Sequence, residues 1–128
     1  MTIAVNALAE HDLQRSIIDE CNWRANQDAR WGLIFCVPNG QYRKGQRMEA
    51  GLKAGVPDLF LPVPRAATKA HPVYHGMFIE LKIGRNVPTG EQERWLRLLR
   101  EQGYYTCWIH DEPSGAIDLL KWYLYGEI

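Results

Sequence analysis

Two short apolar stretches, each with a carboxylate inside it, constrain this chain more than any other feature. They read GVPDLFL, from Gly55 to Leu61, and MFIELK, from Met77 to Lys82, and they contain Asp58 and Glu80. Apolar runs of this length are typical of strands that fill a sheet. An ionised acid that is desolvated and unpaired there destabilises the fold by roughly several kcal/mol. The fold therefore has to supply both carboxylates with a partner.

The rest of the chain alternates between helical and strand-like segments. We expect helices at about 7–28, 46–54, 90–102 and 116–125, and strands at about 33–37, 57–63, 76–83 and 104–110. Turns at 38–40 and 84–88 and a proline-bounded loop at 64–75 separate them. This order predicts an α/β fold in which helices flank a mixed β-sheet. The length of 128 residues predicts one domain, residues 1–128.

Composition narrows the class of protein. The chain is 46% hydrophobic and 23% charged, which is ordinary for a globular protein, and no apolar run approaches the roughly 20 residues of a membrane helix. The first residues lack the basic region of a signal peptide, so we expect a cytoplasmic protein. The three cysteines form no CxxC pair and are expected to be buried free thiols. The middle of the chain is basic, which suits a phosphate-bearing partner but also an ordinary solvated surface.

Strand geometry suggests why the two acids are present. Residues two apart in a strand share a face, so Glu80 and Lys82 project together. Consecutive strands often pair, which would bring Asp58 beside Glu80. Two neighbouring carboxylates repel each other unless a cation lies between them, and Mg²⁺ or Mn²⁺ prefers such oxygen ligands. A lysine beside such a metal suits the hydrolysis of a phosphodiester bond.

Each half of this pattern also has an ordinary explanation. An acid-x-Lys pair is common on exposed strand faces, and Pro-Asp is usually a turn. The combination is more specific, because both acids lie in apolar strands and in this order. A nuclease site is therefore the hypothesis that the two stretches favour together.

Taken in their order along the chain, the motifs resemble those of a known family. GVPDLFL, then HGMFIELKIG, then TGEQERWLRLLREQGYYT, preceded by AEHDLQRSII and FCVPNG, resemble the VRR-Nuc family of the PD-(D/E)xK nuclease superfamily. The resemblance covers about residues 8–110. It implies a restriction-endonuclease-like core and metal-dependent cleavage of DNA. Stand-alone members of the family imply a preference for branched or Holliday-junction-like DNA.

The resemblance also assigns roles to residues in the two stretches. Asp58 matches the acid of the PD motif, and Glu80 and Lys82 match the acid and lysine of ExK. The backbone carbonyl of Leu81 is implied as a further ligand of Mg²⁺ or Mn²⁺. A competing hypothesis is a nucleic-acid-binding module with a decayed site, although such a site would be expected to lack one of these three side chains.

Two further residues have competing interpretations. Gln92 matches a glutamine that often follows ExK, but Thr89-x-x-Gln92 is also a capping box at the start of a helix. Glu10 lies on the apolar stripe of the first expected helix and matches a glutamate that joins the metal site in the family. An acid there also suits the start of a helix. Gln14, one turn further on, would support Glu10.

Basic side chains around the expected site are candidates for phosphate contacts. Such contacts set affinity and salt dependence without reading the base sequence. The candidates are Arg43, Lys44, Arg47, Lys53 and Arg85.

The last expected helix has apolar residues nearly all round. A helix of this kind is either deeply buried or shared with another chain. Because two cuts are needed to resolve a four-way junction, we expect a homodimer through this helix, with packing on the chain's own sheet as the alternative. The residues concerned are Leu119, Leu120, Trp122, Tyr123, Leu124 and Tyr125.

Overall fold

A computed structural model describes residues 2–38, 49–67 and 72–126, with side chains from residue 9 onward. The helices are α1 (Thr2–Arg24), the 3₁₀ helix η1 (Ala29–Leu33), α2 (Gly90–Glu101) and α3 (Pro113–Tyr125). The strands are β1 (Phe35–Cys36), β2 (Leu59–Leu61), β3 (Met77–Lys82) and β4 (Tyr105–His110). Of the predicted phosphate-binding residues, Arg43, Lys44 and Arg47 lie outside the described residues.

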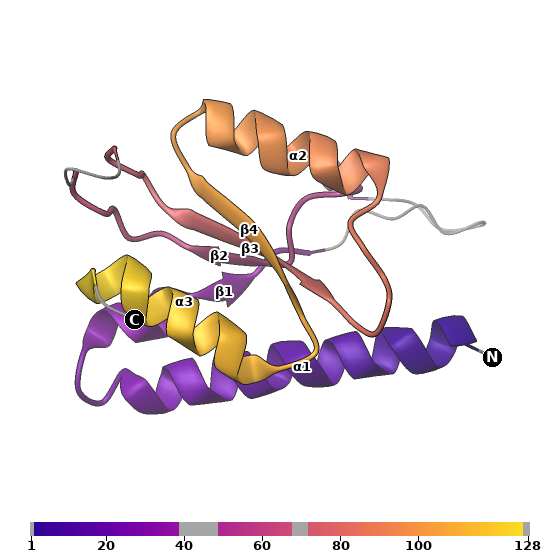
Figure 1. Ribbon diagram of the computed structural model, residues 1–128, viewed down its shortest axis with the longest axis horizontal. Helices are drawn as coiled ribbons and strands as arrows, with labels where there is room; N and C mark the ends of the chain where they lie inside the picture. Colours follow the sequence, from indigo (N-terminus) through magenta and orange to yellow (C-terminus); the bar gives the residue numbers. More distant parts are fainter. Residues whose placement is uncertain (1, 39–48, 68–71, 127–128) are drawn as a thin grey trace.

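The four strands form a mixed sheet in the order β1-β2-β3-β4. The pairs β1–β2 and β2–β3 are antiparallel, whereas β3 and β4 are parallel and are connected through α2. Helix α2 covers one face of the sheet, and α1 and α3 cover the other (Figure 1). The predicted α/β fold with a mixed, helix-flanked sheet is confirmed.

The core lies between the sheet and the two helices α1 and α3. Its α1 side is the helical stripe Leu13, Ile17 and Cys21, with exposed fractions of 4%, 0% and 0%. Alternate residues of β2 and β3 complete it, since Leu59 and Ile79 are paired across the strands and both are buried. Burial of such side chains stabilises the fold by roughly 1.5–3 kcal/mol each.

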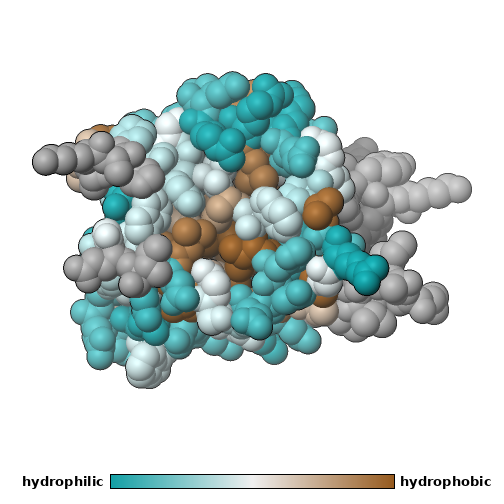
Figure 2. Space-filling view, viewed as in Figure 1, coloured by the Kyte–Doolittle hydropathy of each residue, from teal (hydrophilic) through white to brown (hydrophobic). Residues whose placement is uncertain are grey.

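The face of the molecule on which β4 lies is uneven in hydropathy. Apolar residues gather in the middle of this face, whereas α2 above them is hydrophilic (Figure 2). Within the described residues, no helix combines the length and apolar character that crossing a membrane requires.

Several predicted boundaries move. Helix α1 ends at Arg24 instead of residue 28, because the Asp28 carboxylate accepts a hydrogen bond from the Arg30 N–H and begins η1. Strand β1 is correspondingly shortened to two residues. Helix α3 begins earlier than predicted, with Pro113 in its first turn, where a missing N–H costs nothing.

The helix predicted at 46–54 is wrong over the residues that the structure describes. Residues 49–54 form turns, and Gly51 adopts a left-handed conformation with φ of 93°. A left-handed residue cannot continue a right-handed helix. Residues 46–48 lie outside the described residues.

The surroundings of the cysteines also correct the prediction in part. Cys21 is buried and Cys107 is half-buried, but Cys36 is exposed because β1 lies at the edge of the sheet. Trp23 and Trp108 are 63% and 40% exposed.

The apolar surface of α3 is mostly covered by its own chain. Ala116, Ile117, Leu120 and Tyr123 are buried. Trp122 packs against Tyr105 and lies under the Arg65 guanidinium, 4.4 Å from the ring centroid. The alternative in which α3 packs on its own sheet therefore explains its composition, and the predicted homodimer stays a prediction.

Candidate active site

The pairing of β2 with β3 brings the two acids together. Leu59 is paired with Ile79 in an antiparallel register, so Asp58, one residue earlier, lies opposite Glu80. The Asp58 carboxylate accepts a hydrogen bond of 2.7 Å from the Leu81 N–H. Its backbone carbonyl accepts one of 2.8 Å from the Val37 N–H. Asp58 is thus held at the end of β2 from both sides.

Glu80 and Lys82 project from the face of the sheet that α2 covers. Phe78 stacks on Phe60 on this face, and its cross-strand partner Thr106 donates a hydrogen bond of 3.1 Å to the Leu96 carbonyl in α2. Alternation along β3 places Glu80 and Lys82 on the same side as Phe78. Both are buried, with 2% and 7% of their surface exposed.

The environment of Glu80 disfavours its charge. Burial raises the pKa of the Glu80 carboxyl far above its usual range, and a hydrogen bond to Asp58 and the charge of Asp58 raise it further. Lys82 opposes this shift but does not cancel it. This raised pKa favours the protonated form of Glu80 at neutral pH, as expected for a buried acid beside a second carboxyl group.

Helix α1 supplies a third acid. Glu10 is half-buried, and burial raises the pKa of its carboxyl, while Lys82 lowers it and Asp58 raises it. These influences place Glu10 within electrostatic reach of both strands. In Figure 1, the N-terminal part of α1 extends past the end of the sheet, where β3 ends.

The donor atoms around this cluster fit a hard divalent cation. The Lys82 carbonyl accepts a hydrogen bond from the Asp111 N–H beyond β4. Strand alternation therefore turns the N–H and C=O of Leu81 toward Asp58. Carboxylate and carbonyl oxygens suit Mg²⁺ or Mn²⁺. Among the described residues, no three His, Cys, Asp or Glu side chains already form a group that could hold a metal ion.

The remaining predicted site residues lie in the elements that flank β2 and β3 in the sequence. Gln92 forms the capping box, since its side chain accepts from the Thr89 N–H at 2.9 Å and Thr89 accepts from the Gln92 N–H at 3.2 Å. A further role of Gln92 at the site stays a prediction. Lys53 and Arg85 are exposed, Lys53 in the loop before β2 and Arg85 directly after β3.

Two residues next to the acids escaped the sequence analysis. Trp108 and His110 are the β4 partners of Glu80 and Lys82 in the parallel register, so they lie on the same face of the sheet. Their ring centroids lie 5.0 Å apart, and the His110 Nε2 lies 3.0 Å from the Asn86 carbonyl oxygen. The register between β3 and β4, which no local pattern encodes, is the signal that identifies them.

An antiparallel strand pair with facing acids and an adjacent lysine, within a helix-flanked mixed sheet, defines an α/β nuclease-like core. A family model described as the VRR-NUC domain matches residues 3–110. The chain belongs to the VRR-NUC domain family. It is also similar to a solved structure described as a VRR_NUC domain protein, with 25% identity and a TM-score of 0.67. That similarity covers 90% of this chain and 87% of the other. No curated protein matches the chain.

Proposed function

We propose that this protein is a divalent-metal-dependent endodeoxyribonuclease that hydrolyses DNA phosphodiester bonds. The observation that carries the proposal is the pairing of half-buried Asp58 with buried Glu80, beside the buried Lys82. Such a pair is costly in a fold unless a cation or a reaction uses it. Membership of a nuclease family supports the same activity.

The positions of the side chains and the family resemblance support the following roles. Asp58, Glu80 and the Leu81 carbonyl would hold the metal, and Glu10 would support them. When bound, Mg²⁺ or Mn²⁺ polarises the phosphate and makes a water molecule acidic enough to attack it. Lys82 stabilises the negative charge that develops on the phosphate oxygens. Gln92 lies at the start of α2 and orients groups around the phosphate.

The direct test is cleavage of supercoiled, flapped and four-way-junction DNA with Mn²⁺ or Mg²⁺, with and without a chelator. The proposal predicts products that appear only with metal. DNA binding without any metal-dependent product would favour the alternative, a non-catalytic nucleic-acid-binding module with a nuclease fold.

The same proposal includes a preference for branched or junction DNA. Lys53 and Arg85, which are both exposed, contact the phosphates of that DNA, and so do Arg43, Lys44 and Arg47. Loss of one such contact should weaken binding to all DNA sequences alike. It should also reduce the slope of log affinity against log salt concentration by about one.

A homodimer is the assembly that suits paired cuts at a junction. Because α3 is mostly covered by its own chain, the dimer would use a different surface from the one that the sequence suggests. Light scattering at micromolar concentration, with and without branched DNA, tests this. A monomer under both conditions would leave a nicking enzyme.

A further inference from the structure

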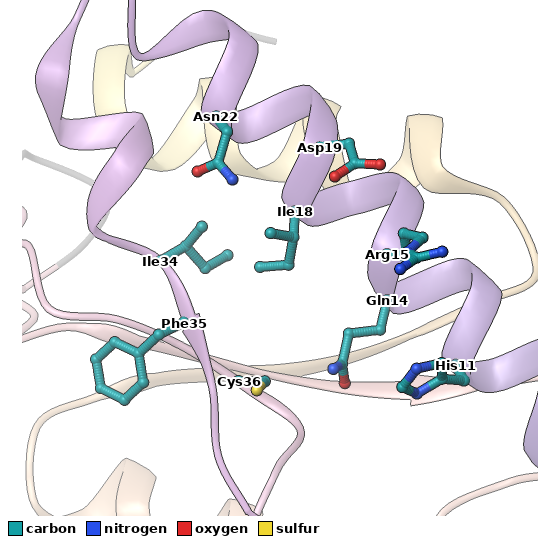
Figure 3. Close-up of a pocket in the computed structure, with 9 residues that line it drawn as sticks. All are labelled: His11, Gln14, Arg15, Ile18, Asp19, Asn22, Ile34, Phe35 and Cys36. Carbon is teal, nitrogen blue, oxygen red and sulfur yellow. The ribbon is translucent and has the colours of Figure 1, made fainter.

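A groove runs between α1 and the edge strand β1 (Figure 3). Its volume of about 380 Å³ lies near the lower end of the range for small-molecule sites. The groove is too small for a DNA duplex but large enough for part of a single strand. Its lining residues are His11, Gln14, Arg15, Ile18, Asp19, Asn22, Ile34, Phe35 and Cys36.

One end of this groove adjoins the candidate active site. On α1, its first lining residue, His11, directly follows Glu10. On the strand side, Cys36 directly precedes Val37, whose N–H donates to the Asp58 carbonyl. A strand held in the groove would therefore lead to the acid cluster.

The lining combines an apolar floor with hydrogen-bonding groups. Gln14, Ile18 and Asn22 point from α1 toward the strand, and Ile34 and Cys36 point toward α1 (Figure 3). The Val37 N–H faces β2, so alternation turns the N–H and C=O of Cys36 away from β2 toward the open edge. These groups offer hydrogen-bond donors and acceptors beside apolar surface.

We propose that this groove holds unpaired nucleotides of the DNA strand next to the cleavage site, an inference that rests on the proposed nuclease function. Nucleobases have apolar faces and hydrogen-bonding edges, and a single strand leaves both accessible. The charges of Arg15 and Asp19 offset each other, so the lining favours bases over a bare phosphate backbone. DNA with a single-stranded arm at the branch is then a better substrate than a fully paired junction.

The exposed thiol of Cys36 reports on the groove directly. Cys21 is buried and Cys107 is half-buried, so a thiol reagent modifies Cys36 first. With a chelator present to prevent cleavage, a single-stranded oligonucleotide of about ten nucleotides should slow this modification about fivefold or more. A duplex of the same length should slow it much less. Equal protection by both, or protection by neither, would overturn the proposal.

A matched pair of variants tests the position of the strand. Asn22→Glu adds a negative charge inside the groove, and Ser16→Glu adds the same charge at an exposed position of α1 outside it. Asn22→Glu should weaken binding of the single strand about fivefold, because a like charge lies near its phosphates. Ser16→Glu should change it little. Equal losses in both variants, or none in either, contradict the proposal.

These measurements separate the inference from the proposed function. They contain no metal and record binding alone, so they succeed or fail independently of cleavage. Protection of Cys36 without any metal-dependent product would keep the groove and remove the nuclease. Metal-dependent cleavage without protection would keep the nuclease and remove the groove as a strand-binding site.

Discussion

The surroundings of Asp28 and those of the Asp58–Glu80 pair have opposite effects on the charge of a carboxylate. Asp28, near the end of α3, has its charge fully matched: Arg30 lies 2.7 Å away, and the Tyr125 hydroxyl donates to it at 2.7 Å. These hydrogen bonds hold the pKa of Asp28 well below its usual range. Glu80 is buried beside the half-buried Asp58, and the pKa of Glu80 is raised.

The difference separates an acid that stabilises the fold from the two acids to which we assign the proposed metal site. The groups around Asp28 satisfy its charge within the chain, and the same Tyr125 hydroxyl accepts a hydrogen bond from Trp31 at 2.7 Å. By contrast, the charge of Lys82 lowers the pKa of Glu80 without cancelling its rise. Unmatched buried charge is where a metal or substrate can add stabilisation, so Asp28 is a control for every test of the site.

The largest expected effect is on cleavage. Asp58→Ala and Glu80→Ala should each reduce the metal-dependent rate more than about a hundredfold, because each removes an oxygen ligand from the site. Asp28→Asn should keep the wild-type rate. Single-turnover cleavage with saturating Mn²⁺ measures all three. A comparable loss in Asp28→Asn would show that the comparison reflects folding, not chemistry.

Lys82→Ala should also slow cleavage, by about 10²-fold, through the loss of a cation that stabilises the transition state. Because Lys82 is not a metal ligand in the proposed site, Mn²⁺ affinity should change only a few-fold. Calorimetric titration with Mn²⁺ separates the two effects. A Lys82 variant that no longer binds Mn²⁺ would instead make this lysine part of the support of the metal site.

Metal affinity should depend on pH with a definite sign. The raised pKa of Glu80 means that metal displaces a proton there, so Mn²⁺ affinity should rise by up to about tenfold per pH unit from pH 5 to 8. Glu80→Gln should lose this slope, and Asp28→Asn should retain it. Titrations at three pH values check this, and a flat profile for the wild type would remove Glu80 as a ligand.

The smallest expected effect is on the stability of the metal-free protein. The pH dependence of this stability has opposite signs for Glu80 and Asp28. The raised pKa of Glu80 means that stability falls as pH rises above its unfolded value of about 4.5. Glu80→Gln should therefore be more stable than the wild type at pH 8. The lowered pKa of Asp28 means that its contribution is present above about pH 4 and is lost below it.

Asp28→Asn should accordingly lower the melting temperature by a few degrees at pH 7, and the difference should disappear near pH 3. Thermal melts across this pH range in a chelator measure both variants. If Glu80→Gln melted below the wild type at pH 8, the Glu80 carboxyl would be stabilising and the contrast with Asp28 would fail.

Local patterns predicted much of the fold, because the elements that carry the site are strongly patterned. The apolar run at Met77–Lys82 and the capping box at Thr89 lie where the sequence places them. Patterns were less reliable around 46–54, where Gly51 adopts a left-handed conformation, and at β1, where the Asp28 cap lengthens the preceding turn. Both depend on backbone geometry that periodicity does not record.

By itself, the sequence determined the nuclease-like α/β order and the identity of the acids and lysine, since alternation along one strand already places Glu80 beside Lys82. Only the tertiary structure decided which groups surround them. The register of β2 against β3 brings Asp58 opposite Glu80, and that of β3 against β4 adds Trp108. The closeness of α1 to β1 forms the groove. These arrangements depend on packing between segments far apart in the chain, and burial at those contacts sets the pKa of Glu80.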